Sequence, residues 1–218
     1  MYRLSSSYRP TNLVRITWRG VLSPKGGYWL KREAADALSS MFAAAKVSNI
    51  SLKILSAYRS YSAQAQVFAK WVAKSGLQLA RKYSAVPGHS EHQLGTTVDL
   101  GSLNGVSWSS PKFPTSPTAL WLESNAYKFG FVRSYPAGSA NIALSCYGAE
   151  AWHWRYVGSS KPIIPPLILR VKAAQSPASA RRLQSCVDQN QPAVKAAYLG
   201  VATNSGCMTK STPRAWPA

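Results

Sequence analysis

Acidic side chains are scarce in this chain of 218 residues. Aspartate and glutamate together number 7 against 26 lysines and arginines, so the formal net charge is +19 and the isoelectric point is near 10.2. A charge of this size favours polyanionic partners through long-range attraction. Nucleic acid and the anionic polymers of a cell wall are both candidates. Because the basic residues are scattered rather than gathered in one stripe, nucleic acid is disfavoured and we expect an anionic wall.

Long hydrophobic runs are also missing. The longest apolar stretch beyond the N-terminal region, residues 162–169, contains three prolines and is too short to span a bilayer, so no transmembrane segment is expected. Residues 1–5 lead into polar sequence without the apolar core of an export signal. We therefore expect either a mature chain or one that is exported by another route.

Cysteine is rare, with three residues at positions 146, 186 and 207. Cys186 and Cys207 could close a disulfide loop, which the sequence alone does not decide, and this pairing would leave Cys146 single. Cys146 lies four residues before Glu150. We expect it to be a buried structural thiol rather than a metal ligand or a nucleophile.

The composition changes once along the chain. Hydrophobic residues at 46% and aromatic residues at 11% exclude a disordered chain, and the length suits one globular domain with additions. Residues 159–218, however, carry 8 lysines and arginines against the single Asp188, with seven prolines and little helical periodicity. We predict a domain at 1–158 and a basic, proline-containing C-terminal extension of unknown role at 159–218.

Local patterns predict alternating helices and short strands. Ala34, Leu38, Met41 and Ala45 recur at helical spacing, which predicts a helix over 31–46 with one apolar face. Residues 1–29 contain prolines and a glycine pair and are typical of an extended arm. The other expected elements are strands at 50–58, 98–102, 131–134 and within 150–157, and helices from Ser60 or Ser62 to about Ser75 and from Ser116 to Phe129.

Histidine is also scarce in this chain. All 3 histidines, His89, His92 and His153, fall in the windows 88–99 and 150–156, which also hold three of the 7 acidic residues. Two imidazoles and a carboxylate are a common ligand set for catalytic zinc. His92, Asp99 and His153 fit that set, and Glu150 fits the base that accepts a proton from water. The alternative is histidines that make only ordinary hydrogen bonds.

The spacing of these residues constrains their setting. His92 and Asp99 are too far apart for neighbouring positions on a helix, and the glycine and β-branched residues between them favour a loop that enters a strand. Glu150 and His153 would point to opposite faces of one continuous strand. We therefore expect Glu150 to lie on a bend before the strand, with His153 and Arg155 sharing one strand face.

A second candidate group precedes these windows. The strand predicted at 50–58 leads to Arg59, and Gln64 falls in the first turn of the following helix. A guanidinium donates two parallel hydrogen bonds to a carboxylate, and a helix N-terminus favours an anion. This pair would suit the C-terminal carboxylate of a peptide. The alternative is that Arg59 is a surface cation, as most arginines are.

Three motifs occur in the order found in a known family. They are Ser56-Ala57-Tyr58-Arg59-Ser60-Tyr61-x-x-Gln64, Ser90-x-His92-x-x-Gly95-x-x-x-Asp99 and Glu150-x-Trp152-His153-Trp154-Arg155-Tyr156. Together they resemble the zinc D-alanyl-D-alanine carboxypeptidases of the VanY type, over residues 10–158. Two positions depart from the family pattern, Thr97 in place of alanine and Ala151 in place of a common proline, and the second would loosen the bend that carries Glu150.

The resemblance implies a fold, a cofactor and a reaction. The fold would be α+β, a small antiparallel sheet with flanking helices of the Hedgehog/DD-peptidase type, and residues 1–158 would be the catalytic domain. One zinc ion held by His92, Asp99 and His153 would serve hydrolysis of the terminal D-Ala-D-Ala bond of peptidoglycan stem peptides, with Glu150 as the general base. Arg59 with Gln64 would bind the terminal carboxylate or the scissile carbonyl.

Further expectations complete this interpretation. Ser90 and Trp152 would contact the substrate, with His89 as an accessory residue, and the protein would be a monomer that acts outside the cytoplasm. The nearest alternative is a peptidoglycan endopeptidase of the same chemistry, as in phage lysins. A non-catalytic module that binds wall or polyanion is another. Glu150 counts against it, because a binding module has no need of a general base.

Overall fold

The computed structural model describes residues 3–18, 27–137 and 147–158. The expectations for the extension at 159–218 and for Cys146, Cys186 and Cys207 concern residues outside these ranges. The described elements are, in chain order, β1 (Leu13–Arg15), β2 (Trp29–Lys31), α1 (Arg32–Val47), β3 (Leu52–Ser56), α2 (Tyr61–Tyr83), η1 (Glu91–Leu94), β4 (Thr97–Ser102), η2 (Phe113–Thr115), α3 (Pro117–Asn125), η3 (Ala126–Phe129), β5 (Phe131–Arg133) and β6 (His153–Tyr156).

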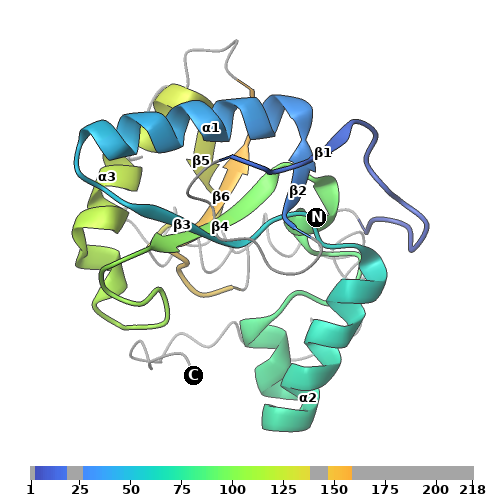
Figure 1. Ribbon diagram of the computed structural model, residues 1–218. Coiled ribbons are helices and arrows are strands. Elements are labelled where there is room, and N and C mark those ends of the chain that lie inside the picture. Colours follow the sequence, from blue (N-terminus) through green and yellow to red (C-terminus); the bar gives the residue numbers. More distant parts are fainter. Residues whose placement is uncertain (1–2, 19–26, 138–146, 159–218) are drawn as a thin grey trace, which may run out of the picture.

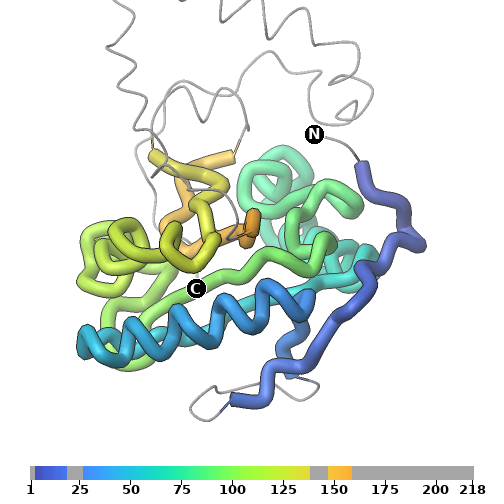
Figure 2. Tube along the Cα trace, turned by 90° about the horizontal axis from the view of Figure 1, so that it is seen from above, coloured from blue at the N-terminus to red at the C-terminus, as the bar shows by residue number. Residues whose placement is uncertain are grey.

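A four-stranded sheet of order β3-β4-β6-β5 forms the centre of the fold, and its neighbouring strands are all antiparallel. Helix α1 lies along one face of the sheet, while α2 and α3 lie at opposite ends of the molecule (Figure 1, Figure 2). This arrangement confirms the α+β class with a small antiparallel sheet. Strands β1 and β2 pair separately as a two-stranded sheet.

The main hydrophobic core lies between α1 and the sheet. The apolar face of α1 is buried as its periodicity predicts, and Leu38 and Met41 are fully inaccessible to solvent. Val98 and Leu100 of β4 belong to the same cluster. Burial of one such side chain stabilises a fold by about 1.5–3 kcal/mol. Because alternate residues of a strand point to opposite faces, Asp99 must face away from α1.

Helices α2 and α3 begin where their caps predict. The Ser60 and Ser116 hydroxyls accept hydrogen bonds from the backbone N–H groups of Ala63 and Ala119. The first helical segment of α2 ends at Gly76, whose φ of 76° and ψ of 161° are not helical, in agreement with the helix predicted to about Ser75; a second segment, which was not predicted, continues to Tyr83 across the kink. Within the described ranges, no helix has both the length and the apolar composition needed to cross a membrane.

The N-terminal arm lies against the loop that leads to β4. The Leu4 N–H donates to the Gly88 carbonyl at 2.8 Å, and the Gln93 side-chain amide donates to the Ser5 carbonyl at 2.9 Å. Gly95 has φ 71°, and a Cβ at this position would lie 2.9 Å from Pro10 Cγ. The loop therefore requires glycine both for its backbone conformation and for the close approach of the arm.

Candidate active site

Asp99, His153 and His92 come from three separate elements. Asp99 on β4 is the direct cross-strand partner of His153 on β6, so both side chains project from the same face of the sheet. The opposite face is filled by α1, and Trp154, the neighbour of His153, is buried there. His92 lies on the short helix η1 before β4. Because these two strands are adjacent and their side chains alternate, Asp99 and His153 project together toward His92 on η1.

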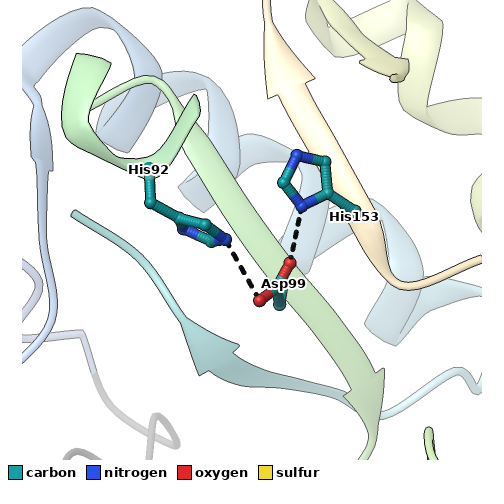
Figure 3. Close-up of side chains that lie close together, drawn as sticks. All are labelled: His92, Asp99 and His153. Carbon is teal, nitrogen blue, oxygen red and sulfur yellow. Dashed lines mark hydrogen bonds and ion pairs between the residues drawn. The ribbon is translucent and has the colours of Figure 1, made fainter. Parts of the chain in front are cut away.

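The three side chains offer ligand atoms that all lie within 4.8 Å of one another. His92 Nε2 lies 3.2 Å from Asp99 Oδ2, and His153 Nδ1 lies 3.1 Å from Asp99 Oδ1, as Figure 3 shows. Tetrahedral zinc with bonds near 2.0–2.1 Å separates its ligand atoms by roughly 3.3 Å. The donor types and spacing therefore fit a zinc ion.

The second nitrogen of each imidazole is already engaged. His92 Nδ1 donates to the Ala57 carbonyl at 2.7 Å, and His153 Nε2 lies 3.0 Å from Glu91 Oε2. A ring nitrogen that holds its proton on an outside acceptor leaves the other nitrogen with a lone pair for a metal. His92 would therefore bind through Nε2 and His153 through Nδ1, the two atoms that face Asp99.

The charges of the site interact strongly in the metal-free protein. Burial alone would raise the pKa of Asp99, but the charge of His92 and hydrogen bonds from His153 and His92 hold this pKa far below its ordinary value. Burial alone would lower the pKa of His153, but hydrogen bonds to Asp99 and Glu91 raise it to about 10. Asp99 is consequently an anion, the state that a zinc ligand requires.

Glu150 lies three residues before His153 and outside strand β6, directly before a bend at residues 151–152, so the two side chains do not belong to one continuous strand, as the sequence predicts. Its Oε2 is 3.6 Å from His153 Nδ1, and its side chain is 15% exposed. Its backbone is fixed on both sides, since its N–H donates to the Tyr135 carbonyl and its carbonyl accepts from Arg133 Nε at 3.1 Å. Burial raises the pKa of Glu150 to about 7, so its carboxyl group exchanges a proton near neutral pH.

Arg59 reaches the same cluster from the segment between β3 and α2. Its Nη2 lies 4.0 Å from Asp99 Oδ2, and hydrogen bonds to Gln64 Oε1 at 2.7 Å and Ser56 Oγ at 2.9 Å fix the guanidinium. Gln64 is 1% exposed and also donates to the Ala85 carbonyl. The structure thus brings Arg59 to the site, whereas Gln64 lies beneath Arg59 and orients it.

The remaining residues named from the sequence lie near the site but are covered. Ser90 is 5% exposed and precedes η1, and His89 is buried beside it. Trp152 is 7% exposed, and its ring makes an edge contact with Trp108 at 5.2 Å in a small hydrophobic cluster with Phe113. Trp152 therefore packs within this hydrophobic cluster. A substrate contact by Ser90 or Trp152 stays a prediction.

Glu91 is a site residue to which sequence reasoning gave no role. It is buried, and its carboxylate contacts His153, Ser134 and Arg155. The available signal was its place beside His92 among only 7 acidic residues. Its partners come from β6 and from the residue after β5, so their contact with Glu91 could not be read from local spacing.

These features define an α+β protein with a mononuclear metal site of the two-histidine, one-aspartate kind beside a buried glutamate. The chain belongs to the VanY family, described as D-alanyl-D-alanine carboxypeptidase, whose profile matches residues 27–159. That range contains the three candidate ligands, Glu150 and Arg59.

Individual relatives agree with this assignment. The protein YodJ of Bacillus subtilis (strain 168) is 35% identical over 161 residues, which are 72% of this chain and 57% of YodJ. The structure of the LdcB LD-carboxypeptidase is 34% identical with a TM-score of 0.62, covering 73% of this chain and 74% of that one. A VanY D,D-pentapeptidase mutant in complex with Zn(II) is 26% identical with a TM-score of 0.56, covering 72% and 84%.

The same comparisons indicate which metal the site binds and how much of its relatives' length this chain covers. The zinc-bound VanY structure and the His/Asp/His cluster of this chain agree on zinc as the metal of this fold. The chain spans about half the length of the curated relatives it matches.

Proposed function

We propose that this protein is a zinc carboxypeptidase that removes the terminal D-alanine from peptidoglycan stem peptides ending in D-Ala-D-Ala. The observation that carries the proposal is the convergence on one sheet face of His92, Asp99 and His153 with Glu150 and Arg59. Its relatives named D-alanyl-D-alanine carboxypeptidase support the substrate class.

Each residue would have a distinct task. His92, Asp99 and His153 would hold zinc, which when bound supplies a Lewis acid that makes water more acidic and polarises a carbonyl. Glu150 would accept the proton of the attacking water and return it to the leaving amine nitrogen. With its pKa near 7, this carboxyl group is suited to both transfers.

Arg59 would bind the oxygen atoms of the substrate. Hydrogen bonds to Gln64 and Ser56 leave further N–H donors of its guanidinium for a ligand. The acceptor is either the carbonyl oxygen as it gains negative charge or the terminal carboxylate. In both cases a fixed fork of donors, in a water-poor site, binds an anion more strongly than a mobile surface arginine does.

A second candidate reaction is the removal of D-alanine from an L,D-linked stem end. It is favoured by the likeness to the LdcB LD-carboxypeptidase, which at 34% exceeds the 26% identity to the VanY structures. Both reactions release a C-terminal residue and need the same metal site. The two differ only in the residue before the cleaved bond.

The activity is tested with three stem peptides of matched sequence. These are a pentapeptide ending in D-Ala-D-Ala, its C-terminal amide, and a tetrapeptide ending in one D-alanine after an L-centre. We expect D-alanine release from the pentapeptide, complete loss of release with a zinc chelator, and at least about tenfold slower cleavage of the amide, because a carboxypeptidase binds the charged terminal carboxylate that the amide lacks. Equal cleavage of the amide would favour an endopeptidase, and faster cleavage of the tetrapeptide would favour the second candidate.

The role of Arg59 is tested by Arg59→Lys. The change keeps the charge but loses the planar fork, so kcat/KM for the pentapeptide should fall about 10–100-fold, the value of one or two charged hydrogen bonds. If Arg59 binds the terminal carboxylate, the variant and the wild type should differ much less on the amide. If it binds the scissile carbonyl, the full difference should persist. The exposed Arg32, changed to lysine, is the matched control.

The expected place of action follows from the substrate. Stem peptides lie in the wall, so we propose an extracytoplasmic enzyme, and its charge of +19 would favour contact with anionic wall polymers.

A further inference from the structure

The carboxylate of Glu91 is enclosed by three donors from other parts of the chain. Its Oε2 accepts from the Ser134 hydroxyl at 2.6 Å and lies 3.0 Å from His153 Nε2, while its Oε1 lies 3.0 Å from Arg155 Nη1. Glu91 is 8% exposed. An ionised carboxylate at this depth is stable only when its oxygens are paired, and here both oxygens have charged or hydroxyl partners.

The position of Glu91 behind His153 has a chemical consequence. As an anionic acceptor it holds a proton on Nε2, so that Nδ1, which faces Asp99, is the nitrogen that would release its proton to bind a metal, and it raises the electron density of the ring. Ser134 and Arg155 restrain the carboxylate so that it cannot turn away from the imidazole. The ring of Tyr135, with its centroid 4.9 Å from that of His153, packs beside the same imidazole.

The two candidate histidine ligands differ in this support. The outer nitrogen of His92 donates to the backbone carbonyl of Ala57, a neutral acceptor that no side-chain substitution removes. Only His153 is supported by a charged side chain. The zinc affinity of the site should therefore depend on Glu91. Glu91 itself would not be a ligand, because it contacts Nε2 of His153, whereas Nδ1 faces the other candidate ligands.

We propose that Glu91 is the positioning residue of the metal site, which fixes the tautomer and orientation of His153 and thereby strengthens zinc binding through Nδ1. The inference rests on the zinc site of the proposed function, but not on the identity of the peptide substrate.

The test is the zinc dissociation constant, measured by competition with a chromophoric chelator for the wild type and for Glu91→Gln. We expect about 10–100-fold weaker binding in Glu91→Gln, the usual effect of losing a carboxylate behind a metal-bound histidine. Glu91→Asp keeps the charge with a shorter reach, so its affinity should be intermediate and more than twofold weaker than that of the wild type. Glu33→Gln, an exposed carboxylate on α1, is the matched control and should bind as the wild type does.

A second measurement separates positioning from a merely structural role. Nitrogen NMR of the zinc-loaded His153 ring should show the proton on Nε2 in the wild type and a weaker or exchanging proton in Glu91→Gln. Zinc affinity within twofold of the wild type, in whichever Glu91 variant folds, would overturn the inference alone. A wild-type protein that binds no zinc would overturn the proposed function as well, and peptide hydrolysis need not be measured to tell the two apart.

Discussion

Replacing Glu150 with glutamine should lower kcat for stem-peptide hydrolysis about 10³-fold, within the range that general acid–base catalysis contributes. Glutamine has nearly the same shape but cannot accept a proton. The Glu150 backbone is held by Tyr135 and Arg133, so the bend should persist in the variant. Zinc content should stay at one per chain, because Glu150 lies outside the cluster of three ligands. Initial rates of D-alanine release and elemental analysis of the same sample measure both quantities.

The control for this prediction is Glu123→Gln. Glu123 pairs with Arg133 at 3.2 Å, and Arg133 also donates a hydrogen bond to the Glu150 carbonyl. Glu123→Gln therefore weakens a contact that supports the Glu150 backbone but leaves the Glu150 carboxyl group unchanged. Exposed ion pairs contribute little, and we expect a rate within about twofold of the wild type. If Glu150→Gln retained more than a tenth of the wild-type rate, Glu150 would not be the base.

The sequence predicted those parts of the fold that depend on local periodicity and caps. The apolar face of α1, the capping serines Ser60 and Ser116, and the bend before His153 all follow from rules that act over a few residues. The pairing of β1 with β2 was missed, because strands of three residues are too short to show an alternating pattern and no tight-turn motif joins them directly. Gly76 interrupts α2 with a positive φ that glycine allows, as predicted, but the second helical segment from there to Tyr83 was missed.

The site was predicted from the scarcity of its residue types together with the resemblance to the VanY-type enzymes, rather than from geometry. With only 3 histidines in the chain, the candidate ligand set was nearly forced, and the structure brings its members together. The residues that support them were harder to recognise. Glu91 on η1 contacts residues of β6 and the residue after β5, and Gln64, expected to contact the substrate, is buried beneath Arg59. Such roles depend on the direction of side chains from non-local elements, which no spacing along the sequence encodes.

Replacing Asp99 with asparagine should remove zinc rather than slow the chemistry directly. Asp99 lies between the two histidines, 3.2 Å from one ring nitrogen and 3.1 Å from the other, and it is the anionic member of the cluster. Protein-bound zinc is held by about 10–16 kcal/mol in total, so the loss of one of three ligands costs roughly 4 kcal/mol, or on the order of 10³-fold in affinity. The purified variant should contain almost no zinc, whereas Asp36→Asn on the surface of α1 should keep a full complement.

Added zinc distinguishes Asp99→Asn from Glu150→Gln. Asp99→Asn should regain part of its activity as the zinc concentration is raised, because its defect is in binding and mass action opposes it. Glu150→Gln should not respond, because its metal is already bound and its missing group is the proton acceptor. Titration of both variants with zinc under one assay therefore assigns the two carboxylates to different tasks. Full zinc occupancy of Asp99→Asn at ordinary concentrations would show that Asp99 is no ligand, and the two histidines would then need a different third partner.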